Sequence, residues 1–206
     1  MIGILDYGMG NVGSIQNMLK HIGYDSVITR DPEQVDGVDK LILPGVGAFD
    51  EGMRQVRRLR LEPLIRRHAL EKQKPLLGIC LGMQLLGTGS EEGSAEGLSL
   101  LPFRCVRFQP GDSTEADYKI PHMGWDRVEI CKPSPLTDGL EGPQRFYFVH
   151  SYYARCTEED VRLLACDYGV RFAAAVSRGN IYGTQFHPEK SHRYGMALLK
   201  NFAARC

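Results

Sequence analysis

The stretch Lys74 to Leu86, KPLLGICLGMQLL, constrains the fold of this chain more than any other. Its apolar run Pro75 to Ile79 is typical of a buried parallel strand, and a helical pattern begins at Met83. Between them, GICLG (residues 78–82) copies the G-x-S-x-G nucleophile elbow, with the thiol of Cys80 in place of a hydroxyl. Glycines suit so tight a turn because they carry no Cβ. The pentapeptide alone fits a catalytic thiol and a buried structural cysteine equally well.

Composition narrows the class of protein. The 206 residues fit one large domain, and we expect a single domain over residues 1–206. Lys and Arg total 25, as do Asp and Glu, so charge gives no reason to expect nucleic acid or an acidic membrane as a partner. The six cysteines form no C-x-x-C pair, which argues against a structural zinc site and a disulfide scaffold. No apolar run reaches the length of a membrane span, so we expect a cytoplasmic α/β protein.

The order of strand-like and helix-like segments predicts an α/β fold. The first half alternates the two kinds, which indicates an open, mostly parallel sheet flanked by helices. We expect strands at Ile2–Asp6, Asp25–Thr29 and Lys40–Leu43, a helix from Val12 to about His21, and a helix over Glu51–Leu70 broken at Pro63. The second half lacks intervening helices and predicts an antiparallel region added to the same sheet. Its strands are expected at Arg104–Phe108, Trp125–Ile130, Arg145–Tyr153, Val161–Tyr168, Ala173–Ser177 and Ile181–Gln185, before a last helix over Met196–Ala203.

One motif near the start supports a different function. Gly8, Gly10 and Gly13 follow the first expected strand as G-x-G-x-x-G, and Asp31 follows the second. This is close to the dinucleotide-binding fingerprint, and it makes a nucleotide-binding oxidoreductase a distant alternative. That alternative leaves the thiol at Cys80 without a role.

A second reactive group follows the last expected strand, in the sequence GTQFHPEK (residues 183–190). His187 lies two residues before Glu189, with Pro188 holding the backbone extended. A thiol nucleophile needs a base, and the base needs a group that fixes its tautomer and stabilises its charged form. His187 and Glu189 can supply these two roles to Cys80.

With these motifs in order, the chain resembles the class I (triad) glutamine amidotransferases. Within that class it is most similar to the glutaminase subunits of imidazole glycerol phosphate synthase, from histidine biosynthesis. The similarity rests on DYGMGN (6–11), LPGVGAF (43–49), GICLGMQLL (78–86), PHMGW (121–125), YFVHSYY (147–153) and QFHPEKS (185–191), which span the chain. It implies a flavodoxin-like class I amidotransferase fold with no cofactor and no metal.

The resemblance also implies roles for individual residues. Cys80, His187 and Glu189 would be catalytic, and Cys80 would hydrolyse L-glutamine to glutamate and ammonia through a thioester. The amide of Leu81 and an amide of the Gly45-Val46 loop would form the oxyanion hole. The residues that hold glutamine would be Gly47, Gln84, Glu92, Ser151 and Tyr152, with Glu92 supplying negative charge to the α-amino group. Residues 87–90, GTGS, lack the bulky and acidic residues expected there, which weakens the alignment at Glu92.

The resemblance further implies a partner, a cyclase subunit with a (β/α)₈ barrel that forms a heterodimer with this chain and receives its ammonia through a tunnel. The cyclase makes imidazole glycerol phosphate and an aminoimidazole carboxamide ribotide. Residues expected at or near the interface are Asn11, His122, Met123, Trp125, Tyr147 and Lys190. The motifs equally fit a paralogous subunit that supplies ammonia to an amidating enzyme of surface-polysaccharide sugar biosynthesis.

Overall fold

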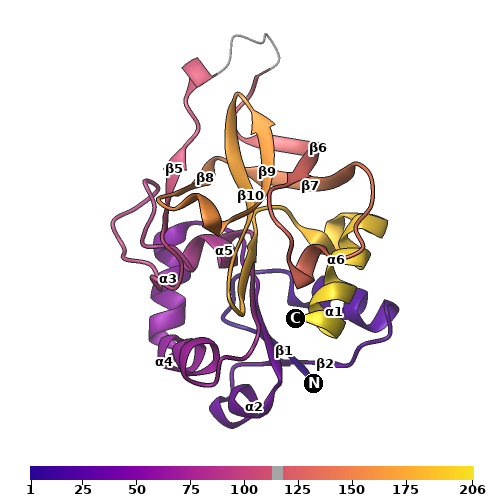
Figure 1. The fold of residues 1–206 in the computed structure, drawn as a ribbon. Coiled ribbons are helices and arrows are strands. Elements are labelled where there is room, and N and C mark those ends of the chain that lie inside the picture. Colours follow the sequence, from indigo (N-terminus) through magenta and orange to yellow (C-terminus); the bar gives the residue numbers. More distant parts are fainter. Residues whose placement is uncertain (113–117) are drawn as a thin grey trace.

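The computed structural model describes residues 1–112 and 118–206, whose strands form one mixed sheet with helices on both faces (Figure 1). The strands are β1 (Ile2–Leu5), β2 (Ser26–Thr29), β3 (Lys40–Leu43), β4 (Leu76–Ile79), β5 (Phe103–Arg107), β6 (His122–Ile130), β7 (Gln144–His150), β8 (Tyr152–Cys156), β9 (Arg162–Tyr168), β10 (Val170–Arg178) and β11 (Ile181–Thr184). The helices are α1 (Val12–His21), α2 (Pro32–Gly37), α3 (Phe49–Arg58), α4 (Leu61–Arg66), α5 (Leu81–Leu85) and α6 (His192–Arg205). Short 3₁₀ or π turns cover Arg67–Glu71, Pro110–Asp112, Pro135–Thr137, Glu159–Val161 and Pro188–Lys190.

The sheet changes from parallel to antiparallel at β11. Strands β2, β1, β3, β4 and β11 lie side by side and run parallel. Beyond β11 the order continues β10, β9, β6 and β7 with antiparallel pairing, and β8 joins β5 to β10. The antiparallel strands extend above the parallel part in Figure 1. The predicted fold class, a mostly parallel sheet with an added antiparallel region, is confirmed.

Two apolar cores, one on each face, hold the helices to the sheet. Side chains of α2, α3, α4 and α5 pack on one face with Leu5 and Leu43, and side chains of α1 and α6 pack on the other with Ile4 and Ile42. Successive residues of one strand point to opposite faces, so β1 and β3 contribute to both cores. Both faces of the parallel strands are therefore buried, as expected of parallel sheets. Among the described residues, no helix is both long enough and apolar enough to cross a membrane.

The register of three neighbouring parallel strands brings three loops to one edge of the sheet. Leu43 of β3 pairs with Gly78 of β4, and Ile79 of β4 pairs with Thr184 of β11. The loops that follow these strands therefore begin beside one another at the carboxyl edge, where α/β sheets bind ligands. One loop carries residues 44–48, another carries Cys80 and the third carries His187.

Three segments differ from the sequence-based expectation. The helix predicted over Glu51–Leu70 breaks at Arg60, which has a φ of 54°, and not at Pro63. Pro63 lies in the first turn of α4, where its missing N–H leaves no helical hydrogen bond unmade. Helix α2 was not predicted, and the strand expected over Arg145–Tyr153 is interrupted at Ser151 between β7 and β8.

Candidate active site

Cys80 lies at the apex of the turn between β4 and α5. Its backbone has a φ of 54° and a ψ of −110°, a conformation that non-glycine residues rarely adopt, and its amide donates to the carbonyl of Thr184 at 2.7 Å. A Cβ at Gly78 would lie 2.7 Å from the carbonyl oxygen of Gly82, and a Cβ at Gly82 would overlap the carbonyl oxygen of Leu43. Both glycines are therefore required by packing, as expected for a nucleophile elbow.

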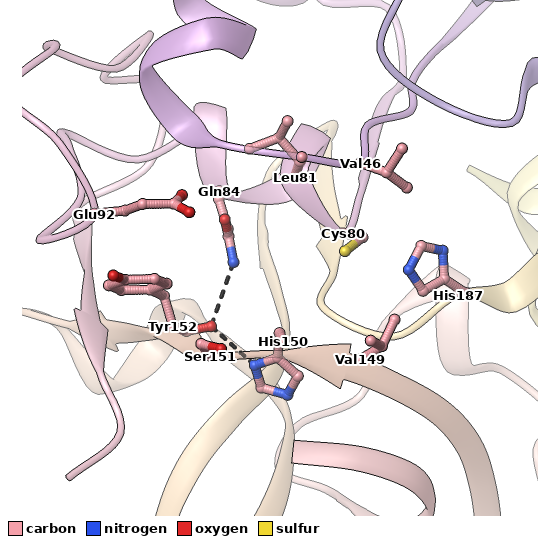
Figure 2. A pocket seen from close by; sticks show the side chains of 11 residues that line it. Val46, Cys80, Leu81, Gln84, Glu92, Val149, His150, Ser151, Tyr152 and His187 are labelled. Carbon is pink, nitrogen blue, oxygen red and sulfur yellow. Dashed lines mark hydrogen bonds between the residues drawn. The ribbon is translucent and has the colours of Figure 1, made fainter. Parts of the chain in front are cut away.

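His187 and Glu189 form a buried pair beside the thiol. Nδ1 of His187 lies 2.8 Å from Oε1 of Glu189, and both side chains are almost fully buried. Nε2 of His187 has no hydrogen-bond partner among the described residues, and Figure 2 shows the ring next to the sulfur of Cys80. Burial lowers the pKa of His187, but Cys80 and Glu189 together outweigh burial and raise the pKa to about 9. The arrangement favours an imidazolium at neutral pH.

A cavity of about 250 Å³ opens over Cys80. Its walls come from the loop after β3, from the elbow and α5, from the end of β7 and from the loop that carries Glu92 (Figure 2). Predicted site residues that line it are Cys80, His187, Leu81, Val46, Gly47, Gln84, Glu92, Ser151 and Tyr152. Val149 and His150 also line it and were not predicted. The structure thus brings together residues as far apart in the sequence as Val46 and His187, and the volume suits a small amino acid.

Polar groups in the cavity wall are held by specific partners. Oε2 of Glu92 accepts a hydrogen bond from the amide of Phe49, at the start of α3, at 2.8 Å. Nε2 of Gln84 donates to the carbonyl of Tyr152 at 3.3 Å and to Oε1 of Gln185 at 3.1 Å. Gln185 was not predicted as a site residue, yet its Nε2 lies 3.8 Å from the sulfur of Cys80. Its position directly after β11 is the sequence signal that could have identified it.

The loop after β3 presents a carbonyl to the elbow. The amide of Leu81 donates to the carbonyl of Gly45 at 3.3 Å. In a trans peptide the N–H of Val46 points opposite to this carbonyl. The pair of amides expected to form an oxyanion hole therefore does not converge in this conformation, and the Gly45–Val46 peptide would have to rotate to supply its N–H.

Most of the residues expected at a partner interface gather on the outer side of β6 and β7. Met123 is 62% exposed and Trp125 is 37% exposed. Trp125 stacks on His192 with ring centroids 5.5 Å apart, and Nζ of Lys190 lies 6.0 Å from the ring centroid of Tyr147. Asn11 is exposed at the start of α1. His122 differs, because it is buried against Phe148 and Tyr168 and points into the protein.

The glycine motif near the start has a structural explanation. Asp31 accepts hydrogen bonds from the amides of Glu33 and Gln34, so it caps α2. Asn11 accepts from the amide of Ser14 and caps α1. Gly8 and Gly10 have positive φ in the turn after β1. The carboxylate of Asp31 and the amide of Ser14, which a dinucleotide would need, are therefore already hydrogen-bonded within the chain.

Comparison with known proteins decides the family. The family model for class-I glutamine amidotransferases matches residues 3–206. The chain belongs to the class I glutamine amidotransferase family. The oxidoreductase alternative is therefore wrong. This amidotransferase is 50% identical over 202 residues to the imidazole glycerol phosphate synthase subunit HisH 2 of Methanococcus maripaludis, with 98% of each chain covered. It is 47% identical to the subunit HisH 2 of Pseudomonas aeruginosa and 49% identical to the subunit HisH of Syntrophotalea carbinolica, again with 98% of each chain covered.

Solved structures support the same fold at lower sequence identity. A putative GMP synthase subunit from Thermoplasma acidophilum matches with a TM-score of 0.72 and 22% identity, over 98% of this chain and 91% of that one. PurLQS from Thermotoga maritima matches with a TM-score of 0.73 and 19% identity, over 98% of this chain and 96% of that one. At these identities the likeness concerns the fold alone.

Proposed function

We propose that this amidotransferase is the glutaminase subunit of an imidazole glycerol phosphate synthase in histidine biosynthesis, which hydrolyses L-glutamine to glutamate and ammonia. Full-length identity of 47–50% to HisH subunits supports the assignment. The observation that carries the chemistry is the thiol of Cys80, held on a strained backbone beside the buried His187–Glu189 pair, at the base of a small cavity.

The first half of the reaction forms a thioester. The Cys80 thiolate attacks the side-chain carbonyl carbon of glutamine, and the carbonyl oxygen becomes an oxyanion. The amide of Leu81 would donate to this oxyanion once it is released from Gly45, and Val46 would donate after its peptide rotates. Such preorganised donors contribute about 3–4 kcal/mol each to transition-state stabilisation. The carbon–nitrogen bond then breaks, and protonated His187 transfers its proton to the leaving nitrogen, which departs as ammonia.

The second half returns the enzyme to its starting state. Neutral His187 removes a proton from water, which attacks the thioester carbon. The carbon–sulfur bond breaks, glutamate is released, and Cys80 is again a thiolate beside an imidazolium. Glu189 holds the ring through Nδ1 in both halves, so that Nε2 stays directed at the reacting atoms.

The cavity walls suggest how glutamine is oriented. Glu92 provides the negative charge for the α-ammonium group, and the backbone at Gly47, Ser151 and Tyr152 provides polar groups for the α-carboxylate and α-ammonium. Gln84 contributes a side-chain amide between them. In this orientation the side-chain amide of glutamine reaches Cys80.

We infer that the partner is a cyclase subunit with a (β/α)₈ barrel, which forms a heterodimer with this chain in the cytoplasm. The exposed cluster of Met123, Trp125, Tyr147, Lys190 and His192 supports a docking face on β6 and β7. A barrel docked there would receive ammonia close to where it is formed. Asn11 would lie at its margin, whereas the buried His122 would support the face from within.

Growth of a histidine-requiring strain tests the assignment. A bacterial strain that lacks its own glutaminase subunit receives this chain, either as wild type or as Cys80→Ala. The cyclase native to this chain is expressed with it in both cases. We expect growth without histidine for the wild type and none for the variant. Purified complex is assayed in parallel for glutamate release from L-glutamine, and absence of any release would refute the glutaminase assignment.

The relatives also favour one second candidate. Two of them are named HisH 2, a numeral that distinguishes them from another subunit of the same name. A paralogous subunit can supply ammonia to an amidating enzyme of surface-polysaccharide sugar biosynthesis. Glutamate release in vitro without growth of the histidine-requiring strain would support this candidate over the first.

A further inference from the structure

A chain of hydrogen bonds links the surface of β6 to the cavity wall. Oδ2 of Asp126 lies 3.0 Å from Nε2 of His122, whose Nδ1 lies 3.0 Å from Nε2 of His150. Nδ1 of His150 lies 2.8 Å from the carbonyl oxygen of Tyr152, as Figure 2 shows. His122 and His150 are buried, whereas Asp126 is 40% exposed beside Trp125. None of the roles proposed above uses this chain.

The acceptor at the inner end fixes the tautomers. A carbonyl oxygen only accepts, so Nδ1 of His150 carries a hydrogen. Burial, and then the nearby His122, lower the pKa of His150 to about 3, so this ring is neutral and its Nε2 accepts. Nδ1 of His122 must therefore donate to His150. Each contact needs one proton, and two neutral imidazoles supply one proton fewer than the three contacts require. The contact between His122 and Asp126 needs this further proton, and burial lowers the pKa of His122 although Asp126 opposes the shift, so the proton is bound towards lower pH.

The chain continues past Tyr152 to the nucleophile. The carbonyl of Tyr152 also accepts from Nε2 of Gln84, and the second hydrogen of that nitrogen goes to Oε1 of Gln185. This orients both side-chain amides. Among the described residues, Gln84 is left with Oε1 as a free acceptor, and Gln185 is left with Nε2 as the donor directed at the sulfur of Cys80, 3.8 Å away.

We propose that Asp126, His122 and His150 are positioning residues that hold one shared proton and, through the carbonyl of Tyr152, fix the amide orientation of Gln84 in the glutamine site. The proposal rests on the glutaminase function proposed above. It assigns the two histidines to substrate orientation and not to acid–base catalysis, because His187 already faces Cys80 and both nitrogens of His150 are engaged.

The shared proton predicts a pH effect of defined sign. The titratable groups that face it are Asp126 on β6, His150 on β7, and Tyr168 and Cys166 on β9, and His187 acts on His150 from the loop after β11. Loss of this proton at higher pH leaves two acceptors facing each other and opens one contact. The Tyr152 carbonyl and Gln84 are then less firmly held, so the KM for glutamine rises with pH.

A matched pair of substitutions at His150 tests the positioning role in the complex with the cyclase. The nitrogen of an asparagine side chain occupies the place of Nδ1 of histidine, and that of glutamine occupies the place of Nε2. His150→Asn keeps the donor to Tyr152 but loses the acceptor for Nδ1 of His122, so we expect its KM for L-glutamine to rise less than that of His150→Gln. His150→Gln loses that donor, and we expect KM to rise roughly five- to tenfold with kcat changed less, the effect of about one hydrogen bond.

Asp126→Asn tests the shared proton without altering the core. The asparagine Nδ2 supplies its own hydrogen to Nε2 of His122 and does not titrate. The KM of this variant should therefore not show the rise with pH that we expect of wild type. Asp126→Leu, which supplies neither group, should raise KM at every pH. If wild type hydrolyses glutamine and all four variants share its KM and pH profile, the positioning chain is refuted. If wild type complex releases no glutamate, the glutaminase function itself fails, which is a different result.

Discussion

At Cys80 the backbone holds a conformation that costs about 1–3 kcal/mol for a residue with a side chain, and the surrounding packing maintains it. No other cysteine has this setting. Cys105 and Cys166 lie in strands, and burial raises the pKa of both thiols. Partial burial also raises the pKa of the Cys131 thiol, although this residue lies at the surface. A reactive cysteine is therefore expected at a single position.

Replacement of that thiol should separate chemistry from folding. Cys80→Ala should lower glutamine turnover by at least roughly a thousandfold, since the reaction loses its nucleophile. A diazo-ketone analogue of norleucine should label Cys80 alone, as read by mass spectrometry of peptides, and Cys131→Ala should be labelled and active like wild type. Labelling of Cys105 or Cys166 with parallel loss of activity would contradict the assignment.

The two carboxylates of the site should give different kinetic signatures. Glu189→Gln removes the charge that helps to raise the pKa of His187 to about 9. That pKa should fall, so the alkaline loss of kcat should begin at lower pH, and kcat should drop roughly a hundredfold or more. Glu92→Gln keeps an acceptor for the amide of Phe49 but loses the charge facing the α-ammonium, so KM should rise roughly tenfold. Steady-state kinetics across pH measures both, and identical signatures would contradict the separate roles.

The sequence predicted candidate reactive side chains but not their supports. Cys80, His187 and Glu189 lie in short motifs directly after predicted strands, and the resemblance to the amidotransferases implied their catalytic roles. His150 was missed, because a histidine within a β-rich run gives no sign that its side chain reaches the cavity, and Gln185 was missed although it lies directly after β11. His122 was expected at or near an interface and is buried, since alternation along β6 turns it inward while Met123 turns outward.

At the scale of elements, the elbow depends on a close approach between α5 and the end of β3. Gly82→Ala would place a methyl group on the carbonyl oxygen of Leu43, which is backbone and cannot move aside without shifting β3. We expect the free energy of unfolding to fall by roughly 2 kcal/mol or more, with loss of activity.

A second glycine provides the control for this substitution. Gly13 lies in α1, and among the described residues no atom outside its chain neighbours and its own helix backbone lies within 4 Å of an added Cβ. Gly13→Ala should leave activity unchanged and raise stability by up to about 1 kcal/mol. Chemical denaturation of both variants measures the contrast, and equal stabilities would show that the elbow tolerates a side chain.

Strands and long helices were predictable because burial imposes a period on the sequence. Strand β3 was placed to the residue, and α1 ended where expected. Helix α2 was missed because it has only six residues, PEQVDG, of which Val35 alone is buried. The helix break was predicted at Pro63 but lies at Arg60. Proline is recognisable in a sequence as a helix breaker, whereas nothing in the sequence indicates that an arginine adopts a left-handed backbone conformation.

At the scale of the whole molecule, the sequence predicted the kind of sheet but not the order of its strands. Alternating segments indicate a parallel sheet, but they do not state that β11 pairs with β4, which sets Cys80 and His187 side by side. That pairing joins segments about a hundred residues apart. It follows from packing of the complete chain, which no local pattern records.

The conformation of the loop after β3 leads to a prediction about regulation. With the carbonyl of Gly45 accepting from Leu81, one expected oxyanion donor is engaged and the other points away. Loss of a single such donor costs about 10²–10³ in rate, so the isolated chain should be a very poor glutaminase. We expect the cyclase with its ribonucleotide ligand bound to favour the rotated peptide, and to raise glutaminase activity roughly 10²–10³-fold by shifting the loop population.

Three steady-state measurements test this coupling: the chain alone, the complex, and the complex with the ribonucleotide ligand. The coupling is allosteric only if the ligand binds the two loop states with different affinity. In that case L-glutamine bound to the inactive Cys80→Ala complex should tighten ligand binding to the cyclase by the same factor that the ligand tightens glutamine binding, because linkage is reciprocal. Full activity of the isolated chain, unchanged by cyclase and ligand, would show that the Gly45 carbonyl does not restrain the reaction, while the roles of Cys80, His187 and Glu189 would stand.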